Sequence, residues 1–153
     1  MLFSSCYMDL FHHAGREYLV IRDKYSGWAE VYDCGRGVST EDVCQHILAW
    51  CMQLGVPRRL ASDGGPQFKS KEFAEFCTTW GIKHDPSSPH HHESNGFAED
   101  MVKSMKRMVQ RIAPNGKIGT PGFFNAMLEY RNTPRKEGVS PAQRLFVQIC
   151  AVH

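Results

Sequence analysis

The order of strand-like and helix-like segments is the feature that most restricts the fold of this chain. Strand patterns come first, over residues 1–11, 17–23 and 28–32, and short turns join them. Such short connections favour an antiparallel meander. Helix and strand patterns then alternate: a helix from Ser39 or Thr40 to Leu54, a strand at 58–62, a helix after Ser70, a strand at 82–84, and then further helices. This order predicts a single α/β domain, in which helices cover both faces of a mixed sheet.

A long amphipathic helix follows the last strand pattern. Residues from 87 onward begin as a loop, and Ser94 or Asn95 is the predicted N-cap. At helical spacing the apolar side chains fall on one face: Phe97, Met101, Val102, Met105, Met108, Val109 and Ile112. The opposite face carries Glu99, Lys103, Lys106 and Gln110. An ordinary exposed helix face with i,i+4 ion pairs would give the same pattern, so other residues must decide its role.

Composition narrows the class of protein only slightly. A chain of 153 residues is long enough to bury a core, and its net charge of +2 is too small to establish a nucleic-acid partner. Four basic residues and no acid lie between positions 101 and 111, however, which is a local basic stripe. Six cysteines without a close-set pattern favour buried, reduced thiols in a cytosolic or nuclear compartment. No apolar run approaches ~20 residues, so we expect no membrane span.

Three acids stand at positions that call for an explanation. Asp63 ends a strand pattern and precedes two glycines, and ligands of open α/β sheets gather beyond the carboxyl ends of strands. Asp9 lies inside the first strand, where aspartate is disfavoured. With Glu99 on the long helix, three carboxylates could converge, although they would repel one another and raise one another's pKa values. Mg²⁺ or Mn²⁺ relieves that repulsion and prefers oxygen ligands.

Simpler interpretations compete with each of these assignments. Asp63 could be a plain turn aspartate. Asp23 also competes for a place among the acids, but it lies between two basic residues at a strand end, which favours a structural role. The triplet at 90–92 suggests zinc, yet consecutive histidines point in different directions and no spaced ligand pair accompanies them, so a solvated loop is preferred. We expect His84 to lie on the surface.

Five segments in order carry a family resemblance: MDLF, EYLVIRDKYSGWAEVY, ASDGGPQFKSKEF, GIKHDPSSPHHHESNGFAED and LEYRNTPRKEGVSPAQRLF. Thirty-five residues separate Asp63 from Glu99. Together these features resemble the catalytic core of retroviral and retrotransposon integrases, most closely the Ty3/gypsy type, whose acids follow a D,D-35-E pattern. We expect residues 1–146 to form this core domain. The last seven residues, 147–153, depart from the pattern and are expected to be a tail of uncertain origin, from truncation or from an error in the gene prediction.

The resemblance implies a fold, a reaction and a metal. The fold is RNase H-like, a five-stranded mixed sheet flanked by helices. The reaction is polynucleotidyl transfer with two metal ions, Mg²⁺ or Mn²⁺: 3′-processing of retroelement DNA ends, an endonuclease step, and then strand transfer into target DNA. Asp9, Asp63 and Glu99 are implied as the catalytic, metal-binding triad. A general RNase H-type nuclease fits the fold but not the 35-residue spacing.

The resemblance also implies the DNA-binding residues. The loop at 90–95 matches the flexible active-site loop of the family, and the long helix matches positions that contact the DNA end. The implied contacts are His90, Ser94, Asn95, Lys103, Lys106 and Arg107. Glu93, Asp85 and Asp100 depart from the family pattern by adding acids near this channel, which predicts weaker binding of phosphate. The alternative function is therefore a domesticated or decayed core that acts as a DNA- or protein-binding module.

Partners and compartment follow from the same resemblance. We expect retroelement ends and target DNA as partners, a homodimer or higher assembly, and a nuclear or cytoplasmic location. We also expect the zinc-binding and C-terminal DNA-binding domains of the family to be missing, so that the core would carry the chemistry but lack much of the machinery of full integration. Whether the chain is a fragment of a longer polyprotein stays open.

Overall fold

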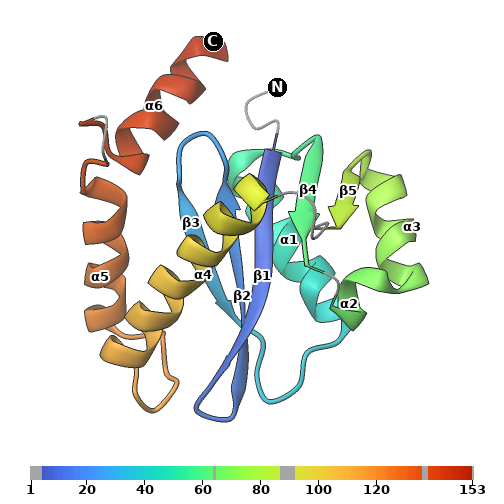
Figure 1. Cartoon of the computed structure of the whole chain (residues 1–153), viewed down its shortest axis with the longest axis horizontal. Coiled ribbons are helices and arrows are strands. Elements are labelled where there is room, and N and C mark those ends of the chain that lie inside the picture. The colour runs from blue at the N-terminus through green and yellow to red at the C-terminus, as the bar shows by residue number, and fades with distance from the viewer. Residues whose placement is uncertain (1–4, 64, 87–91, 136–137, 153) are drawn as a thin grey trace.

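A computed structural model describes residues 5–63, 65–86, 92–135 and 138–152, with the backbone alone described over 92–99, 101 and 151–152 (Figure 1). Five strands form one sheet in the order β3-β2-β1-β4-β5. Their bounds are β1 Ser5–His13, β2 Arg16–Asp23, β3 Ala29–Asp33, β4 Arg59–Ser62 and β5 Lys83–Pro86. The first three strands are antiparallel neighbours, whereas β4 runs parallel to β1 and β5 parallel to β4. The expected meander and the expected mixed five-stranded sheet are thereby confirmed.

Helix ends follow the signals in the sequence. The helices are α1 Thr40–Leu54, α2 Pro66–Lys69, α3 Lys71–Trp80, α4 His92–Ile112, α5 Pro121–Asn132 and α6 Pro141–Val152. The hydroxyls of Ser39, Ser70 and Thr120 each accept a backbone N–H in the first turn of α1, α3 and α5, and Ser39 completes a capping box with Asp42. Each cap satisfies a backbone donor that has no partner inside the helix.

Two expectations about the helices were wrong. We expected α4 to begin at Ser94 or Asn95, with a loop up to that point, but the helix already includes His92. Ser and Asn are weak helix stops when no proline or positive-φ glycine enforces them, and Glu93 stands in a first turn, where acids are favoured. The short helix α2, over the sequence PQFK, was not expected either.

Alternating side chains of β1 supply two separate cores. Cys6 and Met8 pack with α1, α2 and α3 on one face of the sheet, and Tyr7 and Phe11 pack with α4 and α5 on the other. Helices on both faces were expected and are confirmed (Figure 1). Because side chains of a strand alternate between faces, Asp9 lies on the same face as Tyr7 and Phe11, beneath α4.

The amphipathic reading of α4 is confirmed over the described side chains. Met105 and Val109 are fully buried and Met108 nearly so, whereas Lys103 and Gln110 are exposed. Figure 1 shows α4 crossing in front of β1, with α5 beside it and α6 beyond α5. The helix that carries Glu99 therefore lies against the strand that carries Asp9.

The structure also bears on the predictions for the cysteines, for residues 147–153 and for membrane spans. All six cysteines are free. The expected burial is confirmed for Cys6 and Cys77, whereas Cys34, Cys44 and Cys51 are half-buried and Cys150 is exposed. Helix α6 continues without a break across the expected boundary at 146/147, and Ile149 packs against the first core, while the origin of the tail stays a prediction. Within the described part of the chain, no helix combines the length and the apolar character needed to cross a bilayer.

Candidate active site

Parallel pairing of β1 with β4 brings two of the predicted acids level with each other. The register pairs Cys6 with Leu60 and Tyr7 with Ala61. Extending it by two residues places Asp9 opposite Asp63, just past the end of β4. Adjacent strands lie about 4.8 Å apart, so two side chains on the same face at this level are neighbours.

Short local hydrogen bonds hold both carboxylates. The backbone N–H of Leu10 donates to Asp9 Oδ1 at 2.8 Å, and the N–H of Gly65 donates to Asp63 Oδ1 at 3.0 Å. A Cβ atom on residue 65 would lie only 3.2 Å from Asp63 Oδ1. A glycine at 65 therefore leaves room for the Asp63 carboxylate.

The environment of Asp9 favours its protonated form. Partial burial, and next the negative charge of Asp63, raise the pKa of Asp9 from 3.8 to about 7. A hydrogen bond between the two carboxyl groups also raises the pKa of Asp9, because it is made by the neutral form, whereas the Leu10 N–H lowers it. This is the mutual repulsion that the sequence predicted for converging acids.

Glu99 can be placed only through its helix. Its backbone belongs to α4, which packs on the face of β1 that presents Asp9. Its side chain lies outside the described residues, so its approach to the two aspartates stays a prediction. Among the described side chains, no group of three or more His, Cys, Asp or Glu is arranged to hold a metal ion.

The predicted DNA-binding residues fall into two groups. Lys103 and Arg107 are exposed on α4, and Lys106 is half-buried beside them, so their ammonium and guanidinium groups can reach a ligand. His90 and the side chains of Ser94 and Asn95 lie outside the described residues. Their assignment as DNA contacts stays a prediction, as does that of the three basic residues.

Sequence reasoning missed a hydrogen-bonded pair directly behind Asp63. Ser62 is fully buried, and its hydroxyl donates to the carbonyl oxygen of Asp63 at 3.0 Å. The hydroxyl oxygen of Ser62 also lies 2.7 Å from Nε2 of His84. Since the single hydroxyl proton is used, Nε2–H of His84 is the donor in that bond. A small polar residue next to the strand-end acid is the signal that could have suggested this support.

The expectation that His84 lies on the surface was wrong. Its ring is half-buried and packs edge-on against Phe73, with centroids 4.9 Å apart. Burial lowers the pKa of His84, which favours the neutral imidazole, and its Nε2–H tautomer can donate to Ser62. The position follows from the parallel pairing of β4 with β5, which sets Leu60 beside His84 and which no local pattern encodes.

Three other acids considered from the sequence are not part of this pair. Asp23 is buried at the end of β2 and accepts the Ser26 N–H at 2.8 Å, which confirms its structural role in the turn. Asp100 is exposed and lines a cavity together with Arg22, on the side of α4 toward β2 and α6. Asp85 is exposed on the edge strand β5.

The donor set at Asp9 and Asp63 suits a hard divalent cation. Both residues offer only carboxylate oxygens, and the pair is electrostatically unfavourable when both groups are ionised and no cation is shared between them. Zinc would favour nitrogen or sulfur ligands, and Nε2 of His84 is already hydrogen-bonded to Ser62. The residues present therefore fit Mg²⁺ or Mn²⁺.

Comparisons with known proteins agree with this arrangement. A family model described as integrase core domain matches residues 3–92, which include Asp9 and Asp63. An uncharacterized protein of Caenorhabditis elegans is 33% identical over 133 residues, covering 84% of this chain and 10% of that protein. The Gag-Pol polyprotein of avian reticuloendotheliosis virus is 30% identical over 134 residues, covering 84% and 11%. The chain thus spans about a tenth of the length of these relatives.

Solved structures show the same fold. The HTLV-2 integrase catalytic core domain, in complex with magnesium and in dimeric form, superposes with a TM-score of 0.68 at 20% identity and covers 93% of this chain and 95% of that one. A chain of the simian T-cell lymphotropic virus intasome, in complex with the PP2A regulatory subunit B56 gamma, gives a TM-score of 0.74 at 17% identity, with 95% and 55% covered. The fold is therefore RNase H-like, and this chain belongs to the integrase core domain family.

Proposed function

We propose that this chain is the catalytic core of a divalent-metal-dependent polynucleotidyl transferase, of the Ty3/gypsy integrase type, acting on retroelement ends and target DNA. The observation that carries the proposal is the pairing of Asp9 with Asp63 at the end of two parallel strands, where burial and the charge of Asp63 disfavour ionisation of Asp9 unless a cation is shared. Membership of the integrase core domain family supports the reaction class.

Three carboxylates are assigned to hold two Mg²⁺ or Mn²⁺ ions: Asp9 and Asp63, together with Glu99 from α4. Such ions, when bound, activate an attacking oxygen and stabilise a leaving oxygen in an in-line displacement at phosphorus. In 3′-processing the attacking group is water, and in strand transfer it is the 3′-hydroxyl of the processed end. A new P–O bond forms, the P–O bond to the leaving 3′-oxygen breaks, and the leaving oxygen takes up a proton.

Positive side chains of α4 have a positioning role in the proposal. Lys103 and Arg107 are exposed, and Lys106 is accessible beside them on the same helix. Phosphate contacts fix the register of a DNA strand without reading its sequence. His90, Ser94 and Asn95 complete the proposed contacts from the segment before and within the first turns of α4.

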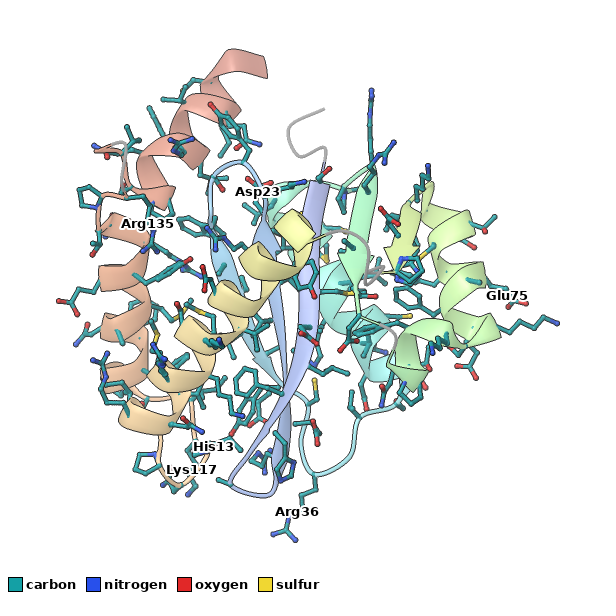
Figure 2. All side chains as sticks on the ribbon, viewed as in Figure 1. His13, Asp23, Arg36, Glu75, Lys117 and Arg135 are labelled. Atoms are coloured by element: carbon teal, nitrogen blue, oxygen red, sulfur yellow. The ribbon has the colours of Figure 1, made fainter. Side chains whose placement is uncertain are left out.

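A nicking and strand-transfer assay on an end-labelled duplex with Mn²⁺ tests the function. Asp63→Asn and Glu99→Gln should each reduce product by at least about 100-fold, because each removes a metal ligand. Glu75→Gln is the matched control, since Glu75 is exposed on α3 at the edge of the molecule (Figure 2), and its pairing with Lys71, at 4.0 Å, is of the weak surface kind. Equal, unchanged activity of Asp63→Asn would contradict the proposal.

A second function has an observation in its favour. Asp85 and Asp100 are both exposed, so the acids that depart from the family pattern remain available to repel DNA. A decayed or domesticated core that binds DNA or protein would keep the fold and lose the reaction. The same assay tests this alternative. If neither the wild type nor Asp63→Asn gives product, while both remain folded and the wild type still binds DNA or protein, the binding-module function is favoured.

Assembly and location belong to the same proposal. We propose a homodimer or higher assembly, because Phe124 and Leu128 on α5 leave 61% and 39% of their surface exposed. Light scattering at high concentration should show a dimer, and a monomer throughout would count against it. A tagged chain should accumulate in the nucleus of a eukaryotic cell, where target DNA is found; exclusion from the nucleus would oppose this.

A further inference from the structure

The cavity that Arg22 and Asp100 share lies between the β2–β3 turn and helices α4, α5 and α6. Its volume is about 640 Å³, which is within the range of ~300–1,000 Å³ typical of ligand pockets. Four cationic residues line it: Arg22 from β2, Lys24 from the turn, Arg135 after α5 and Arg144 from α6. Asp9, Asp63 and the three cations assigned to DNA on α4 are not among its described lining residues.

The cavity has an excess of positive charge among its described lining residues. Among the lining residues that the structure describes, Asp100 is the one acid, against four cations. Burial lowers the pKa of Arg22, and the charge of Arg135 lowers it further, whereas Tyr130, Asp23 and Asp100 raise it. Cations held together at partial burial repel one another, so an anion entering this space would be attracted by all four.

Arg135 also presents hydrogen-bond donors that the described residues leave unused. Its guanidinium lies over the ring of Tyr130, 4.1 Å from the centroid, and its backbone is fixed by bonds with Gly138 and Val139. Stacking on a ring leaves the in-plane N–H groups free to bind oxygen. Nε and Nη2 of Arg135 are buried and have no partner among the described residues, which is costly unless a ligand accepts from them.

Further polar groups around the cavity suit an oxyanion with several acceptor oxygens. Arg144 lies over the ring of Tyr25, with 5.6 Å from its guanidinium carbon to the centroid, and Ser26 and Ser104 bring hydroxyl groups to the wall. Planar guanidinium groups match phosphate oxygens in pairs, and hydroxyls donate to those that remain. A single carboxylate offers only two oxygens and would use fewer of these donors.

We propose that this cavity binds phosphate groups, with Arg135 as the principal hydrogen-bond donor and Arg22, Lys24 and Arg144 as the surrounding charge. The ligand is a polyphosphate-bearing molecule or the phosphodiester backbone of a nucleic acid, which share this chemistry. The site needs no divalent ion, so its occupation is separable from the proposed transferase reaction.

Calorimetric titration with inorganic tripolyphosphate, in EDTA and at about 0.15 M salt, tests the site. Arg135→Gln should weaken binding by about tenfold, because one charge and a forked donor are lost. Arg36→Gln is the matched control: Arg36 is exposed at the opposite end of the molecule from Arg135 (Figure 2), and this variant should bind like wild type. Asp100→Asn should strengthen binding about threefold, since it removes the acid that opposes the anion.

The remaining outcomes separate the sources of phosphate and decide the proposal. If Arg135→Gln fails to fold, Lys24→Gln takes its place, with Lys117→Gln as control, and should weaken binding about threefold. A labelled duplex titrated in EDTA distinguishes the two sources, and Arg135-dependent binding of either probe supports the site. Equal affinity of wild type and Arg135→Gln for both probes would overturn it. The phosphate proposal would also be overturned if a poly-glutamate peptide bound in an Arg135-dependent way while neither phosphate probe bound.

Discussion

Replacing Asp9 by asparagine should stabilise the metal-free protein at neutral pH. Asparagine keeps the size of the side chain and removes the charge that opposes Asp63. In the wild type, burial and Asp63 raise the pKa of Asp9 from 3.8 to about 7. The folded state therefore binds more protons than the unfolded state between about pH 4 and pH 7, and the stability of the wild type falls as the pH rises through this window.

The expected gain in stability of Asp9→Asn follows from the raised pKa of Asp9. A change of about three pKa units corresponds to about 4 kcal/mol, since each unit is worth 1.36 kcal/mol. Asp9 keeps partial contact with solvent, which screens the repulsion, so we expect about half of this, ~2 kcal/mol. For a domain of this length, 2 kcal/mol corresponds to an increase of about 4–8 °C in Tm.

Thermal melts of wild type and Asp9→Asn in EDTA, between pH 4 and pH 8, measure this difference in stability. The Tm advantage of Asp9→Asn should be full near pH 8 and vanish near pH 4, where the wild-type carboxyl is also neutral. Addition of Mg²⁺ should raise the Tm of the wild type and leave that of the variant nearly unchanged. Asp85→Asn, on the exposed edge strand, serves as control and should show neither effect. An Asp9→Asn protein that melts at or below wild type at pH 8 would refute the reasoning.

Other substitutions test the support of the site and the fold. Gly65→Ala should weaken Mg²⁺-dependent stabilisation several-fold, because the new Cβ crowds Asp63 Oδ1. The Tm of the metal-free protein should change little, because the φ of −59° at residue 65 suits alanine. Gly37→Ala, at a residue with open space around it, is the control in the same Mg²⁺ titration. Arg131→Lys should lower the free energy of unfolding in urea by about 1–2 kcal/mol. Lysine cannot stack its planar group over the Trp28 indole, and it loses the Nη2 that contacts both the Ala29 carbonyl and the Glu30 carboxylate. Ser39→Ala should cost about 1 kcal/mol by the same measurement, and no loss would show that the capping box contributes nothing.

Much of the site was predictable because its signals are local. Asp63 stands where a strand pattern stops before glycines, and Asp9 interrupts an otherwise apolar alternation, so both could be singled out before their neighbours were known. The support from Ser62 and His84 could not be singled out in the same way. A serine before an acid and a histidine 22 residues later have no local relation until β4 and β5 pair in parallel. The meeting of Glu99 with these acids is still a prediction from spacing.

What the sequence by itself determined is the kind and extent of most elements, because caps, turns and periodic apolar residues act over a few residues. Ser39 and Ser70 begin their helices as predicted, and β1 divides its side chains between two faces as its alternation required. Only the tertiary structure decided which distant charges meet. Parallel register brings like-charged Asp9 and Asp63 together, and helix packing brings Arg22, Arg135 and Arg144 around one cavity. These encounters raise the local electrostatic energy, so burial of the apolar faces around them must hold them in place.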